Sequence, residues 1–114
     1  TAVRFMPHVA AFFRGISLTI AFELDHPVSA EELETTFQQA YAGEKRIRVG
    51  AGIPQVSDVQ NTPDVHIGGF DIDARNPVQG SLVVVLDNLL KGAASQAMQN
   101  LNLALGLDEN AGIK

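Results

Sequence analysis

The segment Gly15–Leu24 constrains the fold of this chain most, because apolar residues alternate with polar or small ones over nine positions from Ile16 onward. Successive side chains of a β-strand point to opposite faces of the sheet, so this alternation predicts a strand that buries one face. Pro27 ends the strand region, since proline cannot donate a hydrogen bond to a neighbouring strand. The apolar positions are Ile16, Leu18, Ile20, Phe22 and Leu24.

A helix is predicted directly after Pro27. Ser29 and Glu32 have the S-x-x-E spacing of a capping box, in which each side chain bonds a free backbone N–H at the helix start. Gly43 predicts the end of the helix. Apolar residues at helical spacing indicate that the helix covers a core from one side. They are Leu33, Phe37, Ala40 and Tyr41.

Three further strands are predicted, at Ile47–Val49, Val65–Ile72 and Ser81–Asp87. The Gly-Gly pair inside the second indicates a bulge or a close backbone contact. The third contains five consecutive apolar residues, which favours a central strand covered on both faces. The segment Gly50–Pro63 is rich in turn residues and predicts a loop with one edge strand at Val56–Val59.

The last predicted element is a helix from Asn88 to about Leu105, ended by Gly106. Sequential antiparallel strands with the two helices on one face indicate an α+β fold with a mostly antiparallel sheet. Two helices on one side leave Val83 and Val85 exposed on the other, so we expect self-association there. The apolar face of the last helix comprises Leu90, Ala94, Ala97, Leu101, Ala104 and Leu105.

The length, charge and residue composition of the chain argue against several classes of function. A length of 114 residues suits one domain, and 8 basic against 13 acidic residues give a net charge of -5, which argues against nucleic acid or an anionic membrane as a partner. No apolar run is long enough for a transmembrane helix, so we expect a cytoplasmic protein.

The chain has no cysteine, and its three histidines lack the spacing of helical metal sites, so no metal site is predicted. Asp71-x-Asp73 lacks the rest of a calcium loop and is better explained as a hairpin end.

Two segments carry candidate chemistry. Arg14 lies in the irregular approach to the first strand, where its guanidinium could bind a carboxylate or phosphate; a surface arginine is the alternative. Asp87 and Asn88 lie where a strand runs into a helix start, whose free N–H groups suit an anion or an amide. The alternative is that one of them only caps the helix.

The same two segments resemble N-acetyl-γ-glutamyl-phosphate reductase. The first comprises Phe5-Met6-Pro7-His8 and Arg14-Gly15-Ile16, and the second runs from Asp87-Asn88-Leu89 through Lys91-Gly92-Ala93-Ala94 to Gln99-Asn100-Leu101-Asn102. The second motif is long and specific, and the resemblance spans essentially the whole chain. It implies the fold of the C-terminal domain of glyceraldehyde-phosphate and aspartate-semialdehyde dehydrogenases, and a role in arginine biosynthesis.

The resemblance implies NADPH-dependent reduction of an acyl phosphate, a small-molecule substrate, to an aldehyde through a cysteine thioester. That cysteine and the glycine-rich dinucleotide loop are absent from these 114 residues. The resemblance therefore implies that residues 1–114 are the C-terminal substrate and dimerisation domain, with the helix at about 88–105 packing on a missing N-terminal NADP-binding Rossmann domain. It also implies a homodimer or a higher homo-oligomer, and a fragment that is inactive alone.

Residue by residue, the resemblance implies that Asn88 contacts the nicotinamide carboxamide and that Arg14 binds the substrate anion. His8 is the candidate for the catalytic histidine. A different class of function stays open: a free-standing α+β module that binds a small regulatory ligand needs no nucleophile and suits this length.

Overall fold

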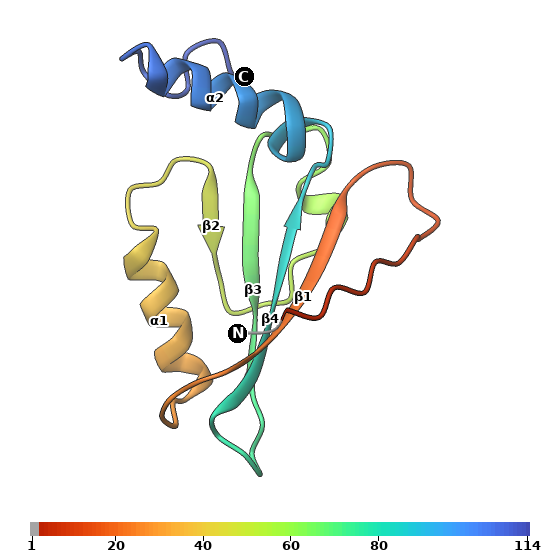
Figure 1. Cartoon of the computed structure of the whole chain (residues 1–114), viewed down its shortest axis with the longest axis vertical. Helices are drawn as coiled ribbons and strands as arrows, with labels where there is room; N and C mark the ends of the chain where they lie inside the picture. The colour runs from red at the N-terminus through yellow and green to blue at the C-terminus, as the bar shows by residue number, and fades with distance from the viewer. Residues whose placement is uncertain (1–2) are drawn as a thin grey trace.

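The computed structural model describes residues 3–114 and contains one four-stranded sheet with the strand order β1-β4-β3-β2. Strands β1 and β3 each pair antiparallel with β4, while the short strand β2 pairs parallel with β3 (Figure 1). The predicted α+β class with a mostly antiparallel sheet is thus confirmed. The strands are β1 (Ile16–Glu23), β2 (Ile47–Val49), β3 (Val65–Ile72) and β4 (Gln79–Leu86).

Strand β4 is an inner strand, as its apolar sequence predicts. Leu18 lies opposite Val84 and Ile20 opposite Leu82, so the alternating apolar residues of β1 share one face with those of β4. We call this the first face of the sheet. The opposite, second face carries Thr19 and Ala21 of β1 beside Val83 and Ser81 of β4.

Helix α1 (Ala30–Ala40) packs on the first face over β3 and β2. The Oγ of Ser29 accepts a hydrogen bond from the backbone N of Glu32 at 3.1 Å, which confirms Ser29 as the N-cap. Within the described residues the Glu32 side chain does not return the second bond of the predicted capping box. The ring of Phe37 lies 5.3 Å from that of Phe70 on β3, centroid to centroid. The helix leaves the β1 side of this face partly open, as a groove of about 490 Å³ lined by residues such as Ile20 and Phe22.

The segment between β2 and β3 differs from its prediction. Val56–Asp58 forms one turn of 3-10 helix, η1, so the edge strand predicted at Val56–Val59 is wrong. The segment instead packs over the second face, where a Cβ on Gly68 would lie 2.2 Å from the carbonyl oxygen of Gly52. This close approach explains the Gly-Gly pair, and the register of β3 against β4 shifts there as predicted.

Because this segment covers part of the second face, Val85 is fully buried and Val83 is half-buried. The prediction that both valines are exposed on an uncovered face is therefore wrong. The part of the second face that the structure leaves open lies around Thr19 and Ala21, which are exposed.

The last helix begins later than predicted. After β4, Leu90–Ala94 form a wide π-type turn, η2, and α2 spans Ser95–Ala104. Figure 1 shows α2 lying across the end of the sheet, whereas α1 packs on the first face. Among residues 3–114, each helix is too short or too polar to span a lipid bilayer.

The two sides of α2 have an unusual polarity. Its buried residues are polar: Ser95, Gln99 and Asn102. The apolar residues of α2 and Leu105 directly after it face outward, and Leu101 and Leu105 expose 55% and 64% of their surface. The predicted apolar face of this helix therefore exists, but it covers no core within the described residues.

Candidate functional site

The site is built around Asp87, which directly follows β4 and is fully buried. Its Oδ1 accepts hydrogen bonds from the backbone N of Leu89 at 2.9 Å and of Leu90 at 3.1 Å, where the chain turns into η2. The same oxygen lies 2.7 Å from Nη2 of Arg14. Its Oδ2 accepts from the backbone N of Asn61 at 2.8 Å. Asp87 therefore caps the helical segment, as predicted, and also joins it to two distant loops.

These contacts keep Asp87 ionised. Burial by itself would raise the pKa of Asp87, but the Arg14 guanidinium and the three backbone N–H donors outweigh it and lower the pKa to about 2. A carboxylate that accepts several hydrogen bonds is stabilised in its charged form. Asp87 thus stays negative throughout the physiological pH range.

Arg14 reaches into the fold rather than into solvent, and only 18% of its side chain is exposed. Besides the contact with Asp87, its Nη1 donates to Oδ1 of Asn61 at 3.0 Å, and its carbonyl oxygen accepts from Nε2 of Gln60 at 2.9 Å. Both terminal nitrogens therefore have partners within the chain, while the buried Nε has none among residues 3–114. The predicted role of Arg14 in binding a substrate anion stays a prediction.

Asn88 stands next to Asp87 and is half-buried. Its Oδ1 accepts a hydrogen bond from the backbone N of Gly15 at 2.7 Å, although the two residues are 73 positions apart. This contact orients the side-chain amide, since the oxygen is held toward Gly15. The amide nitrogen Nδ2 makes no hydrogen bond within the described residues and remains a donor for another molecule.

The Gly15–Asn88 contact requires glycine at position 15. Gly15 has φ of +121°, a conformation that residues with a side chain rarely adopt. A Cβ at this position would lie 2.2 Å from Cγ1 of Val56. The two motifs singled out in the sequence, Arg14-Gly15 and Asp87-Asn88, are therefore brought together by two side-chain hydrogen bonds.

Two residues of the site were not predicted. Asn61 is the only residue other than glycine among residues 3–114 with a positive φ, at 63°, and Gln60 precedes it. Asparagine tolerates this left-handed conformation better than most residues, which was a signal for a turn at Asn61. Nothing in the sequence indicated that this turn would contact Arg14 and Asp87.

His8 lies apart from secondary structure, in an exposed irregular segment before β1. It makes no hydrogen bond or ion pair within residues 3–114, and its catalytic role stays a prediction. The same residues contain no group of three His, Asp or Glu side chains placed to hold a metal ion.

A second polar cluster lies beneath α2. Nζ of Lys91 donates to Oε1 of Gln99, and burial lowers the pKa of Lys91 below its ordinary value. Nδ2 of Asn102 donates to the carbonyl oxygens of Glu109 at 3.0 Å and of Ala111 at 2.9 Å. Two of the polar residues on the buried side of α2 therefore attach other segments to it: Gln99 bonds η2 before the helix, and Asn102 bonds the segment after it.

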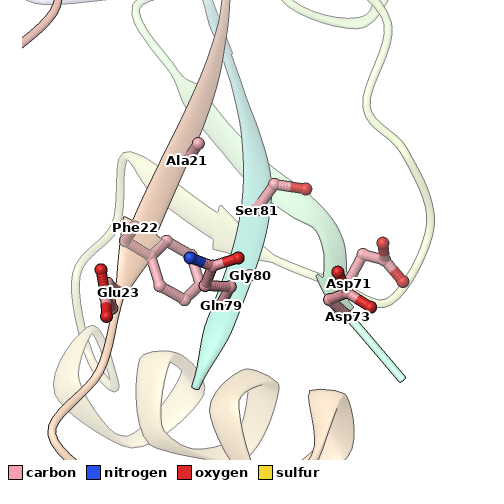
Figure 2. Close-up of a pocket in the computed structure, with 8 residues that line it drawn as sticks. All are labelled: Ala21, Phe22, Glu23, Asp71, Asp73, Gln79, Gly80 and Ser81. Carbon is pink, nitrogen blue, oxygen red and sulfur yellow. The ribbon is translucent and has the colours of Figure 1, made fainter. Parts of the chain in front are cut away.

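An open hollow of about 620 Å³ lies at the far end of β4 from Asp87. Figure 2 shows Ala21 and Ser81 on neighbouring strands, with Asp71 and Asp73 where β3 ends. The Oδ1 of Asp73 accepts from the backbone N of Arg75 at 2.8 Å, as expected for a hairpin end. The hollow is acidic and lies on the second face, away from the motifs that carry the resemblance.

Comparison with protein families matches residues 1–88 to the model described as semialdehyde dehydrogenase, dimerisation domain. An N-acetyl-gamma-glutamyl-phosphate reductase of Stenotrophomonas maltophilia is 53% identical over 108 residues, which are 95% of this chain and 34% of that protein. The bifunctional protein argC, mitochondrial, of Dictyostelium discoideum is 47% identical over 98% of this chain and 13% of its own length. The chain therefore spans about a third or less of the length of these curated relatives.

Solved structures give the same fold. An aspartate semialdehyde dehydrogenase II from Vibrio cholerae matches with a TM-score of 0.67 and 31% identity, over 82% of this chain and 28% of that one. A probable aspartate-semialdehyde dehydrogenase from Pseudomonas aeruginosa matches with a TM-score of 0.68 and 28% identity over the same shares. The resemblance stated from the sequence and the fold that it implied are confirmed. Because relatives include proteins named as mitochondrial, a cytoplasmic location stays a prediction.

Proposed function

Because the chain belongs to the semialdehyde dehydrogenase dimerisation-domain family, we propose that it works as the C-terminal portion of an NADPH-dependent N-acetyl-γ-glutamyl-phosphate reductase. The observation that carries the proposal is 53% identity to a protein of that name over 95% of the chain. The partial coverage of such proteins supports a longer protein with an additional nucleotide-binding domain. We refer to that longer protein as the full-length reductase.

In the proposed reaction, a cysteine thiolate attacks the acyl carbon of N-acetyl-γ-glutamyl phosphate, the bond from that carbon to the phosphate oxygen breaks, and phosphate leaves. NADPH, when bound, supplies the hydride that reduces the resulting thioester. The bond from the acyl carbon to the cysteine sulfur breaks, which releases the aldehyde and restores the thiolate. These 114 residues contain no cysteine, so the nucleophile has to come from another part of the full-length reductase. The role of this chain is to bind and orient.

Asn88 is the residue that we assign to the cofactor. A nicotinamide carboxamide offers an acceptor oxygen, and the Nδ2 of Asn88 is a donor whose orientation is set by the Gly15 contact at Oδ1. The donor set therefore fits an amide ligand. Arg14 is less suited to bind the substrate anion directly, because its side chain is mostly buried and each terminal nitrogen already donates one hydrogen bond within the chain, to Asp87 and to Asn61.

The exposed leucines of α2 support a contact with the NADP-binding domain. Leu101 and Leu103 of α2, and Leu105 directly after it, are each more than half exposed. Burial of apolar surface contributes roughly 25 cal/mol per Å², so a helix with this face gains stability by packing on a further domain. The groove beside α1 is concave and apolar, and a convex segment of the full-length reductase suits it better than the same groove of a second copy.

Dimerisation is proposed to use the open part of the second face. Thr19, Ala21 and Ser81 have small side chains, which let two sheets approach closely. A two-fold dimer would place the same patch of both subunits in contact. The proposed interface is smaller than the one predicted from the sequence, which included Val83 and Val85, because Val85 is buried within the subunit.

The experiment is to express the complete open reading frame and the 114-residue chain separately, and to follow NADPH absorbance with N-acetyl-γ-glutamyl phosphate as substrate. We expect turnover by the full-length reductase and none by the 114 residues. Absence of turnover by the full-length protein, or an open reading frame limited to these residues, would favour the free-standing regulatory module instead.

A further inference from the structure

The dipeptides Arg14-Gly15 and Asp87-Asn88 form a closed ring of contacts. Nη2 of Arg14 lies 2.7 Å from Oδ1 of Asp87, and the backbone N of Gly15 lies 2.7 Å from Oδ1 of Asn88. Because Arg14 and Gly15 are neighbours in the chain, as are Asp87 and Asn88, the two hydrogen bonds join the same two backbone segments side by side. The side chain of Asn88 is thus held through a neighbour that is itself fixed.

We propose that Arg14 and Asp87 are positioning residues that hold the amide of Asn88 with its Nδ2 directed to the cofactor. This inference rests on the proposed function, in which Asn88 contacts the nicotinamide carboxamide. It assigns to Arg14 an action through Asp87 and Gly15 in place of direct contact with a substrate anion.

The contacts around the ring show how the position is held. Asp87 is also bonded to the backbone of Leu89 and Leu90, so its own place is fixed by the start of the helical segment. Arg14 is bonded to Asn61 on the other side, and Asn61 bonds Asp87 in turn. Three segments of the chain therefore fix the place from which Gly15 donates to Asn88.

Loss of the Arg14 contact would release this arrangement. Gly15 would no longer be held at the φ of +121° from which its N–H reaches Asn88. The amide of Asn88 could then rotate by half a turn and present its oxygen where a donor is required. A side-chain amide has a donor end and an acceptor end, so its orientation determines which group of a ligand it can bind.

The test uses the full-length reductase and three single variants: Arg14→Gln, Arg14→Lys and Asn88→Ala. The main readout is the dissociation constant of NADPH from fluorescence titration, with kcat, both KM values and the melting temperature measured beside it. Arg46→Gln is the matched control, because it removes a different partly buried arginine, one that pairs with Asp64 at 3.3 Å.

We expect Asn88→Ala and Arg14→Gln each to weaken NADPH binding about 5- to 10-fold, the effect of losing roughly one hydrogen bond. Arg14→Lys, which keeps the charge but not the two-sided contact, should lie between Arg14→Gln and the unaltered protein. Combining Arg14→Gln with Asn88→Ala should weaken binding little more than Asn88→Ala alone, because both changes act through one amide. Arg46→Gln should lower the melting temperature without changing NADPH affinity.

Other outcomes would overturn the inference. If Arg14→Gln lowers only the melting temperature, as Arg46→Gln does, its role is structural. If it raises only the KM of the acyl phosphate, Arg14 binds the substrate anion directly. Unchanged NADPH affinity in Asn88→Ala would refute the cofactor assignment itself, whereas an effect of Asn88→Ala without one of Arg14→Gln would refute the positioning role alone.

Discussion

The replacement Asp87→Asn tests the electrostatics of the site most closely. Lowering the pKa of Asp87 from 3.8 to about 2 corresponds to about 2 kcal/mol of folding free energy at neutral pH. An asparagine also places an NH2 group where one oxygen of Asp87 now accepts, so at least one buried N–H loses its partner, at about 1 kcal/mol or more. Because the same backbone N–H donors already contribute to the lowered pKa, the two figures overlap, and we expect Asp87→Asn to lower the free energy of unfolding by about 2 to 3 kcal/mol at pH 7.

The stability lost in Asp87→Asn should depend on pH, and the direction follows from the lowered pKa of Asp87. A folded-state pKa below the unfolded one stabilises the folded protein above pH 4, and this stabilisation is lost as the pH falls toward 2. The difference in stability between the unaltered protein and Asp87→Asn should therefore shrink by about 1 kcal/mol between pH 5 and pH 3. The other acidic residues titrate in both proteins, so their contributions cancel when the stability of the variant is subtracted from that of the unaltered protein.

The assay is urea unfolding of the full-length reductase and the variant at pH 7, 5 and 3. Asp73→Asn is the matched control, since Asp73 is an exposed aspartate that accepts one backbone hydrogen bond. It should cost less than about 1 kcal/mol, because surface substitutions usually have small effects. A stability difference for Asp87→Asn that stays constant from pH 7 to pH 3 would show that the Arg14–Asp87 pair does not keep Asp87 ionised.

Three further outcomes are expected. Asn88→Asp should keep the oxygen that accepts from Gly15 but lose the Nδ2 donor, so the KM for NADPH should rise as it does in Asn88→Ala. If both variants have the kinetics of the unaltered protein, Asn88 does not contact the cofactor. Gly15→Ala should both lower the melting temperature and weaken NADPH binding, because the added Cβ would clash with Val56. An unchanged melting temperature and an unchanged NADPH affinity would argue against the ring of contacts. Ala21→Lys should dissociate the dimer, as measured by sedimentation equilibrium. Ala42→Lys is the control and should leave the dimer intact, because Ala42 is exposed in the turn after α1. A dimer that survives Ala21→Lys would place the interface elsewhere.

Much of the fold could be predicted from local patterns. The strand β1, the Ser29 cap of α1 and the Gly-Gly bulge of β3 each depend on residues close in the sequence, and each is confirmed. The burial predicted for the apolar face of β1 is not, because Ile16, Leu18 and Ile20 stay exposed in this chain. The failures concern tertiary placement. The predicted edge strand at Val56–Val59 rested on its two valines, but Val56–Asp58 forms a turn, because the segment packs over β3 and β4 rather than pairing at an edge.

The orientation of α2 could not be predicted either. Periodicity locates an apolar stripe but does not say whether that stripe faces this domain or another surface. Here the buried side is polar, since Asn102 and Gln99 bond the chain segments around the helix. Capping by Asp87 was predictable from its place between a strand and a helix, whereas its contacts with Arg14 and Asn61 depend on chain segments that meet only in the folded protein.

The central claim is that this domain presents the amide of Asn88 to a nicotinamide cofactor. The most direct measurement is a crystal structure of the full-length reductase with NADP⁺ bound. We predict that Nδ2 of Asn88 lies within about 3.2 Å of the carboxamide oxygen, with Gly15 still bonded to Oδ1 and Arg14 still bonded to Asp87. A cofactor whose carboxamide is bound elsewhere, or an Arg14 that has left Asp87 for the substrate, would contradict the account.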